Sequence, residues 1–168
     1  RARDESAAPE LADSKLIAPS RRVELVRTIT TWVPTAVGSA SAAEIDELGM
    51  AAALRLACQR ALAELGIQPT VVVQDGSASW IPDSLDEAVQ RVIRPKLDLT
   101  SAACAAASIV AKVHRDEWMV EHGARYPQWP ALVTSAGYGT KAHAAQIKEH
   151  GVCELHRRSW SFVARLTQ

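Results

Sequence analysis

Two aspartates stand where a divalent metal ion could bind. Asp75 follows the most strongly β-prone run, residues 70–73, and Asp98 directly precedes an alanine-rich helical stretch that Thr100 or Ser101 can cap. A carboxylate at the carboxyl end of a strand lies where α/β sheets place their ligands. Oxygen donors on neighbouring elements suit Mg²⁺ or Mn²⁺, so we expect the two carboxylates within about 8 Å of each other. The alternatives are an ordinary Asp-Gly turn and a helix cap or dipole partner.

A glycine-flanked tyrosine and a lysine could contact nucleic acid. Tyr138 stands in a Gly-Tyr-Gly-Thr sequence, where its ring could stack on a sugar or base and its hydroxyl could reach a 2′-OH. Lys112 ends the alanine-rich stretch and could face phosphate. The alternatives are a tight turn into a helix and a solvated charged face. His143, His150 and His156 lack a compact metal-ligand spacing, which favours surface or packing roles.

Charge is balanced overall but unevenly distributed. The 168 residues, 48% of them hydrophobic, carry 19 Lys and Arg against 19 Asp and Glu, so global charge predicts neither a polyanion-binding protein nor an acidic tail. Residues 61–111 hold six acids and three bases, whereas residues 112–168 hold eight bases, five acids and all five histidines. An acidic middle beside a basic C-terminal part suits a metal site flanked by a phosphate-binding face.

Cysteine usage and hydropathy predict a cytoplasmic protein. Cys58, Cys104 and Cys153 lie far apart, which is typical of neither a disulfide scaffold nor a zinc ribbon. The longest apolar-rich run, residues 102–111, is too short to span a bilayer, and the chain does not start with a signal-peptide pattern. Because the sequence opens on Arg1 rather than Met, we expect that further residues precede it.

The expected elements alternate between helices and strands. Helices are predicted over residues 19–31, 41–66, 100–122 and 140–151, strands over 35–39, 70–73 and 89–93, and a loop over 126–138. Ser41-Ala-Ala-Glu44 forms a capping box, and Thr140 caps the last helix. The alternation predicts an α/β layered fold, with residues 1–168 as a single domain.

Several motifs occur together in one order. They are Asp13-Ser-Lys15, SAAEIDEL at 41–48, Asp75-Gly76, AAASIVAK at 105–112 with Asp98 ten residues before Ser108, His114-Arg-Asp116, GYGT at 137–140 with His143, and His156-Arg-Arg-Ser159. In this combination the chain resembles ribonuclease HII, the type 2 ribonuclease H of bacteria, over about residues 11–163.

The resemblance implies a ribonuclease H-like fold, with a mixed five-stranded sheet, flanking helices and a helical C-terminal part. It implies a monomeric endonuclease that cleaves RNA in RNA–DNA hybrids and at ribonucleotides embedded in duplex DNA, using four carboxylates and two Mg²⁺ or Mn²⁺ ions. By motif position Asp75 and Asp98 match the third and fourth carboxylates. Tyr138 matches the tyrosine that reads the ribose at the junction, and Ser14 and Lys15 match a loop near the nucleic-acid backbone.

The family's opening motif, an Asp-Glu pair followed by Gly-Arg-Gly, is absent here. Asp4-Glu5 is followed by Ser6-Ala7 and stands too close to Asp13 for two strands to lie between, so we do not transfer that role to it. We therefore expect an N-terminally incomplete domain whose apolar strand at 71–73 needs a second neighbour and which does not fold alone. The alternatives are a non-catalytic nucleic-acid-binding remnant and, more remotely, an unrelated α/β fold of structural role.

Overall fold

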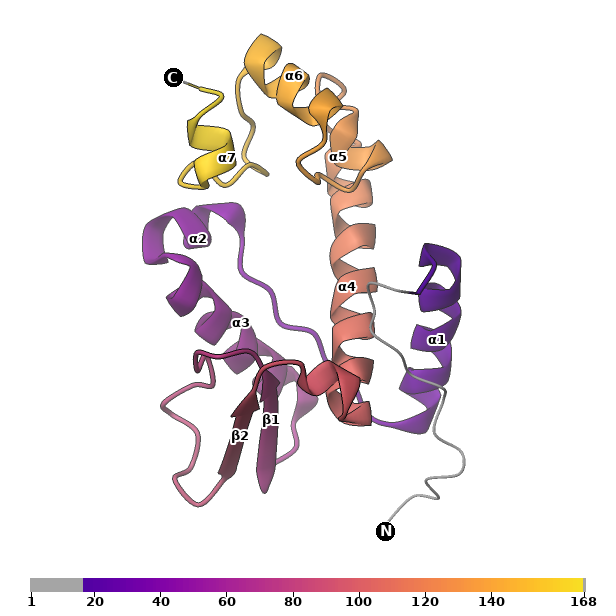
Figure 1. Cartoon of the computed structure of the whole chain (residues 1–168), viewed down its shortest axis with the longest axis vertical. Helices are drawn as coiled ribbons and strands as arrows, with labels where there is room; N and C mark the ends of the chain where they lie inside the picture. Colours follow the sequence, from indigo (N-terminus) through magenta and orange to yellow (C-terminus); the bar gives the residue numbers. More distant parts are fainter. Residues whose placement is uncertain (1–16, 168) are drawn as a thin grey trace. The chain divides into compact units, whose positions relative to one another are not determined.

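The computed structural model describes residues 17–167, which divide into two compact units (Figure 1). The first unit contains residues 17–38 and 57–113, and the second contains residues 39–56 and 114–167. In chain order the elements are α1 (Pro19–Trp32), α2 (Ala42–Leu48), α3 (Met50–Leu65), β1 (Val71–Asp75), β2 (Gln90–Arg94), the 3₁₀ helix η2 (Leu97–Leu99), α4 (Ala102–Gly123), α5 (Ala131–Thr134), α6 (Lys141–His150) and α7 (Ser161–Ala164). The predicted α/β class is confirmed, while the single-domain boundary stays a prediction.

Two parallel strands of the first unit form the sheet of the described residues. Val71 pairs with Gln90 and Asp75 with Arg94, so both predicted strands are confirmed with slightly shifted ends. The β-branched run at 70–73 predicts a buried strand, and this is wrong here, because Val71 and Val73 of β1 are 45% and 36% exposed. Alternate residues of a strand share a face, so these two valines leave one face of β1 partly open to solvent. Pairing on the second edge of β1 stays a prediction.

The strand predicted over residues 35–39 is wrong. Residues 34–40 are irregular, and Gly38 packs its backbone against α3. A Cβ atom at Gly38 would lie 2.0 Å from the carbonyl oxygen of Ala57 and 2.4 Å from the amide nitrogen of Ala61. The β-prone residues here therefore cover a helix, whereas a strand would need a hydrogen-bonding neighbour that local propensity does not specify.

The helix predicted over residues 41–66 is two helices. Gly49 separates α2 from α3 with a φ of 77°, a left-handed conformation that a continuous helix does not allow. At the start of α2 the predicted capping box is confirmed: the Glu44 amide donates to Ser41 Oγ at 3.2 Å, and the Ser41 amide donates to Glu44 Oε2 at 2.8 Å. The region predicted as a loop over residues 126–138 also contains α5, a single turn that follows Pro130.

Each unit has its own apolar core. In the first, Leu25 and Ile29 of α1 pack with Ala106, Ile109 and Val110 of α4, so the small side chains of the alanine-rich helix allow a second helix to pack closely. The core of the second unit combines residues of α4–α7 and the segments between them: Met119, Trp129, Leu132, Ile147, Cys153 and Val163.

The described helices and cysteines have the following properties. Within residues 17–167, each helix is too short or too polar to cross a membrane. Cys58, Cys104 and Cys153 are free thiols.

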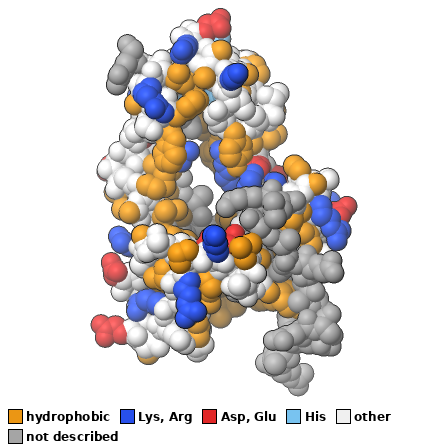
Figure 2. All heavy atoms as spheres, viewed as in Figure 1, with side chains coloured by type: hydrophobic (Ala, Val, Ile, Leu, Met, Phe, Trp, Pro, Cys, Tyr) orange, Lys and Arg blue, Asp and Glu red, His pale blue; other side chains and the backbone are white. Residues whose placement is uncertain are grey.

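On the face drawn in Figure 2, hydrophobic side chains reach the surface beside Lys and Arg side chains, as is common on a globular protein.

Candidate functional site

Asp75 ends β1 and is tied to the segment that carries Asp98. Its Oδ1 atom accepts a hydrogen bond from the Leu97 amide at 3.1 Å, across 22 residues of sequence. The turn after it is made by Gly76, which has a φ of 121° and donates its amide to the Arg94 carbonyl. Because Gly76 makes the turn, the Asp75 side chain is available to join β1 to η2.

Asp98 lies in η2, next to the amide that Asp75 binds, and is half-buried. The helix that follows is capped by Ser101, whose Oγ accepts from the Cys104 amide at 3.4 Å. Asp98 is therefore not needed as the cap of α4. Lys96 enters η2 with a φ of 62°, in the left-handed region that non-glycine residues seldom adopt. The cost of that conformation is offset by the contacts that fix η2 against β1.

The Cys104 thiol is within electrostatic range of both carboxylates. Burial raises the pKa of its thiol, and the negative charges of Asp75 and Asp98 raise it further, while a hydrogen bond with the Asp75 backbone lowers it. A thiolate is disfavoured beside two carboxylates because like charges repel. Sequence reasoning assigned Cys104 no role beside the two carboxylates. Its position in the first turn of the alanine-rich helix, six residues after Asp98, is the signal that could have found it. The expected separation of about 8 Å between the carboxylates stays a prediction.

Gln74, which sequence reasoning also missed, holds the loop that follows Asp75. It is 2% exposed; its Nε2 donates to the Ala78 carbonyl at 2.7 Å and its Oε1 accepts from the Trp80 amide at 3.0 Å. A polar residue in an otherwise apolar strand is the sequence signal for such a brace, since a buried amide must be hydrogen-bonded.

The oxygen donors at the candidate site of the first unit suit a hard cation. Carboxylate oxygens are the ligands that Mg²⁺ and Mn²⁺ prefer. Within residues 17–167, Asp75 and Asp98 are two such donors, and His, Cys, Asp and Glu do not gather there in a group of three or more that could hold a metal. Asp75 and Asp98 therefore fit an oxygen-ligand site as two of its ligands.

Tyr138, in the second unit, presents its ring to solvent. The residue is 46% exposed, as a ring that is to stack on a sugar or base requires, and the Arg115 guanidinium lies over the ring at 4.6 Å from its centroid. Arg115 Nη1 also donates to the Ala136 carbonyl and to Asp116 Oδ1. Gly137 has a φ of 70°, and a Cβ there would lie 2.6 Å from Met119 Cε. The loop is therefore fixed to α4.

A chain of hydrogen bonds through two buried histidines ends at the Tyr138 backbone. The Cys153 amide donates to His156 Nδ1 at 3.0 Å, so the His156 proton is assigned to Nε2. That nitrogen lies 3.0 Å from His143 Nε2, and His143 Nδ1 lies 3.1 Å from the Tyr138 carbonyl oxygen. The packing role predicted for these histidines is confirmed, whereas their direct contact was missed, because they are 13 residues apart.

Asp46 fixes the segment that follows His156. It accepts hydrogen bonds from the Arg158 amide at 2.8 Å, the Ser159 amide at 2.9 Å and the Ser159 hydroxyl. Burial raises the pKa of the Asp46 carboxyl, but these bonds and the charge of Arg158 outweigh it, so the pKa lies below its usual value. Sequence reasoning assigned Asp46 no role, since its partners are more than 100 residues away.

The remaining predicted contact residues are less constrained. Lys112 is half-buried on α4, in the first unit. Ser14 and Lys15 lie outside the described residues. Their contacts with nucleic acid stay predictions.

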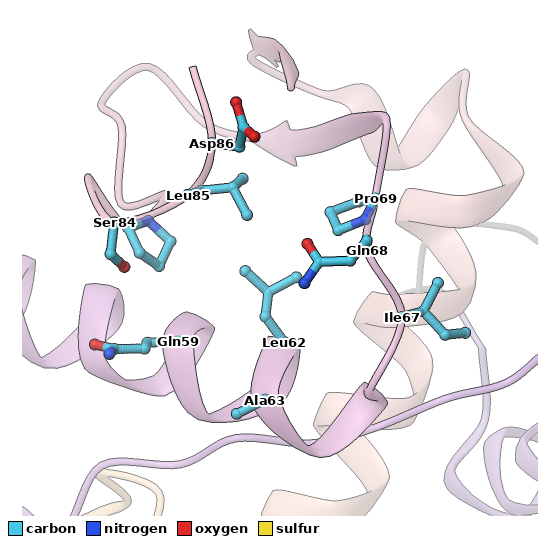
Figure 3. Close-up of a pocket in the computed structure, with 10 residues that line it drawn as sticks. Gln59, Leu62, Ala63, Ile67, Gln68, Pro69, Ser84, Leu85 and Asp86 are labelled. Atoms are coloured by element: carbon cyan, nitrogen blue, oxygen red, sulfur yellow. The ribbon is translucent and has the colours of Figure 1, made fainter. Parts of the chain in front are cut away.

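A pocket of about 500 Å³ in the first unit lies apart from these residues (Figure 3). Gln59, Leu62 and Ala63 of α3 line one side, and residues 67–69 and 84–86 line others. Its lining includes none of the residues predicted to bind metal or nucleic acid.

Comparisons with known proteins agree with the resemblance. The ribonuclease HII family model matches residues 2–163. The chain is 43% identical over 159 residues to ribonuclease HII of Streptomyces griseus subsp. griseus, covering 93% of this chain and 66% of that protein. It is also 43% identical over 154 residues to ribonuclease HII of Geobacillus thermodenitrificans, covering 91% of this chain and 57% of that protein. The chain thus spans about two thirds or less of the length of these relatives.

A solved structure supports the fold. The crystal structure of ribonuclease H2 from Pyrococcus horikoshii OT3 superposes with a TM-score of 0.68 at 21% sequence identity, covering 92% of this chain and 79% of that one. The predicted ribonuclease H-like fold is confirmed.

Proposed function

This chain belongs to the ribonuclease HII family, and on that premise we propose that it is a metal-dependent endonuclease. Its substrates are the RNA strand of RNA–DNA hybrids and ribonucleotides embedded in duplex DNA. The observation that carries the proposal is the link between β1 and η2, in which Asp75 binds the Leu97 amide beside Asp98. The charges of Asp75 and Asp98 both raise the pKa of the Cys104 thiol, which supports an oxygen-ligand site at the end of this strand.

In this proposal Asp75 and Asp98 are metal ligands. Bound Mg²⁺ or Mn²⁺ supplies activation of the attacking water and stabilisation of the leaving 3′ oxygen. Asp75 contributes an orientation set by the Leu97 amide, and Asp98 lies next to that amide in η2. A carboxylate whose rotamer is fixed before the ion arrives loses less entropy on binding, which favours a defined geometry for in-line cleavage.

Tyr138 reads the sugar in the same proposal. Its exposed ring and the glycines beside it allow close approach to a ribose, and the bond from His143 to its carbonyl keeps its backbone in place. Ser14, Lys15 and Lys112 contact the backbone of the nucleic acid, together with the basic part at 112–168. The three free cysteines fit action in a reducing cytoplasm. The proposed enzyme acts as a monomer.

A second candidate function is binding of the same nucleic acids without cleavage. It is favoured by the small carboxylate set: within residues 17–167 no group of three or more His, Cys, Asp or Glu could hold a metal, and a two-cation site usually needs several carboxylates. Binding would then rest on the second unit, where Tyr138 and its hydrogen-bonded loop lie.

Metal-dependent cleavage distinguishes the two functions. We would incubate the chain with a DNA duplex holding one ribonucleotide and with an RNA–DNA hybrid, each with Mn²⁺, Mg²⁺ or EDTA. Cleavage with Mn²⁺ or Mg²⁺ that Asp75→Asn abolishes supports the endonuclease. Duplex binding without cleavage supports the second candidate, and a chain that neither binds nor cuts contradicts both.

The matched control for Asp75→Asn is Asp86→Asn. Asp86 is an exposed acid of the same unit whose Oδ1 accepts from the Ala88 amide two residues on. It tests loss of a carboxylate away from the candidate site. Equal losses of cleavage in the two variants would remove the case for Asp75.

A further inference from the structure

The second unit contains a second pairing of a guanidinium with an exposed ring. The Arg157 guanidinium lies over the Trp160 ring at 4.0 Å from its centroid, and Trp160 is 41% exposed. Arg115 and Tyr138 repeat this arrangement at 4.6 Å, with Tyr138 46% exposed. The His156–Ser159 motif contributes to the family resemblance, but neither Arg157 nor Trp160 has a role in the proposed function.

Two observations link these two pairs. Burial lowers the pKa of Arg157, and the positive charge of Arg115 lowers it further, while Asp46 opposes the shift. The loops that carry the rings also pack: a Cβ at Gly139, next to Tyr138, would lie 3.4 Å from the ring of Phe162, two residues after Trp160. Two guanidiniums within reach of each other's charge repel, and an anion bound between them relieves that repulsion.

The segment that carries Arg157 is fixed on both sides before any ligand arrives. On one side the His156 ring is 5% exposed and lies 3.0 Å from His143. On the other, Asp46 accepts the amides of Arg158 and Ser159. Asp46 is therefore occupied by backbone donors. Such a segment presents Arg157 in one conformation, and fixing the ligand-free state lowers the entropy cost of binding.

We propose that Arg157 and Trp160 are a second backbone contact for nucleic acid beside Arg115 and Tyr138. The two guanidiniums bind one phosphate, and the Trp160 ring lies against the adjoining sugar or base. A guanidinium stacked on a ring keeps its N–H donors at its edge, where they can make charge-assisted bonds to phosphate oxygens. The proposal rests on the proposed function in one respect: it takes nucleic acid as the ligand.

A backbone contact has a consequence that separates it from sugar reading. Phosphate and stacking contacts are shared by ribose and deoxyribose strands, so this surface should strengthen binding of both about equally. Tyr138, in contrast, should affect the preference for ribose. Each role can therefore fail without the other.

The test measures duplex binding by fluorescence anisotropy in EDTA, so that cleavage does not interfere. The probes are a fluorescein-labelled DNA duplex with one ribonucleotide and the same duplex in all-DNA form. Trp160→Ala should weaken binding of both probes by about tenfold, and Trp160→Phe, which keeps a stacking ring, should restore most of it. Arg157→Gln should weaken both probes and reduce the slope of log affinity against log salt by about 1.

Trp118→Ala is the matched control. Trp118 is 38% exposed and stacks on His122 at 4.0 Å between centroids, so it also removes an exposed tryptophan ring from the second unit. Its binding should equal that of the unmodified chain. Thermal unfolding of each variant checks the fold, and Arg157→Gln provides the test if Trp160→Ala does not fold.

Four outcomes decide whether Arg157 and Trp160 contact the nucleic-acid backbone. Losses in Trp160→Ala and Arg157→Gln on both probes, with Trp118→Ala unchanged, support the proposal. Unchanged binding in these two variants while Tyr138→Ala loses ribose preference overturns it and leaves the proposed function standing. A Trp160→Ala effect on the ribonucleotide probe alone also overturns it. An unmodified chain that binds neither probe overturns both the proposal and the proposed function.

Discussion

Asp75 in the first unit is held to η2 by the Leu97 amide, whereas the Tyr138 loop in the second unit is held from α4, α6 and α7. The β1 strand that carries Asp75 leaves Val71 and Val73 partly exposed, while the Tyr138 loop follows an apolar core that includes Leu132 and Met119. The two candidate sites are therefore supported to different degrees by the described residues. The second unit has its loop braced by described residues, and the first unit offers a carboxylate pair on a small sheet.

The largest expected effect is in the first unit. Asp98→Asn should lower the cleavage rate by more than about 100-fold, because loss of a partner behind a metal ligand already costs roughly 10–100-fold. Binding of the ribonucleotide-containing duplex in EDTA should stay within about twofold, since Asp98 contacts metal in our proposal. Single-turnover cleavage and anisotropy measure the two quantities. Loss of binding together with cleavage would show that the two units are not separable in function.

The next effect is a pH dependence of stability from the second unit. Burial, and then the charge of His143, lower the pKa of His156 to about 4, whereas a histidine in an unfolded chain titrates near 6.5. Between these values the unfolded state binds more protons, so stability falls as the pH falls from about 7 to 4. The free energy of unfolding should decrease by about 3 kcal/mol over that range.

Urea unfolding at several pH values measures this dependence. His156→Gln should flatten the profile, and His114→Gln, which changes an exposed histidine of α4, should keep it. Equal slopes in all three proteins would contradict the role of the histidine pair.

Tyr138→Ala should have a smaller effect, on the preference for ribose. The preference for a ribonucleotide-containing duplex over an all-DNA duplex should fall by about 1–3 kcal/mol, the scale of one stacking contact, because the ring is the exposed part of the loop. Tyr138→Phe should keep the stacking share and lose the share due to the hydroxyl. Competition binding between the two duplexes measures the preference. A preference that survives in the alanine variant would exclude sugar reading by this loop.

The smallest effect concerns Asp46. Asp46→Asn should destabilise the second unit by about 1 kcal/mol, because an amide replaces one of two oxygens that accept from Arg158 and Ser159. The depressed pKa of Asp46 means that its contribution is present above about pH 4 and is lost as the pH falls further. Thermal unfolding at pH 7 and pH 3 measures it, with Glu47→Gln of the same helix as the control. An unfolding midpoint equal to that of the unmodified chain at both pH values would contradict the role.

Local chemistry was enough for much of the secondary structure. Ser41 and Thr140 cap α2 and α6 as predicted, because a capping side chain bonds to an amide three residues away. The parallel strands followed from β-branched residues, although their pairing did not. The family resemblance rested on motif order and was confirmed by the comparisons.

What the sequence by itself determined are therefore properties set within one turn or one strand: helix starts, strand positions, free cysteines and the motifs of a ribonuclease HII. Tertiary structure alone decided that His143 meets His156, that Asp46 binds Ser159 across 113 residues, and that Gly38 packs on α3 in place of a strand. These contacts join residues that do not neighbour each other along the chain. Their energies depend on burial and on the geometry of donor and acceptor, which exist only once the units have folded.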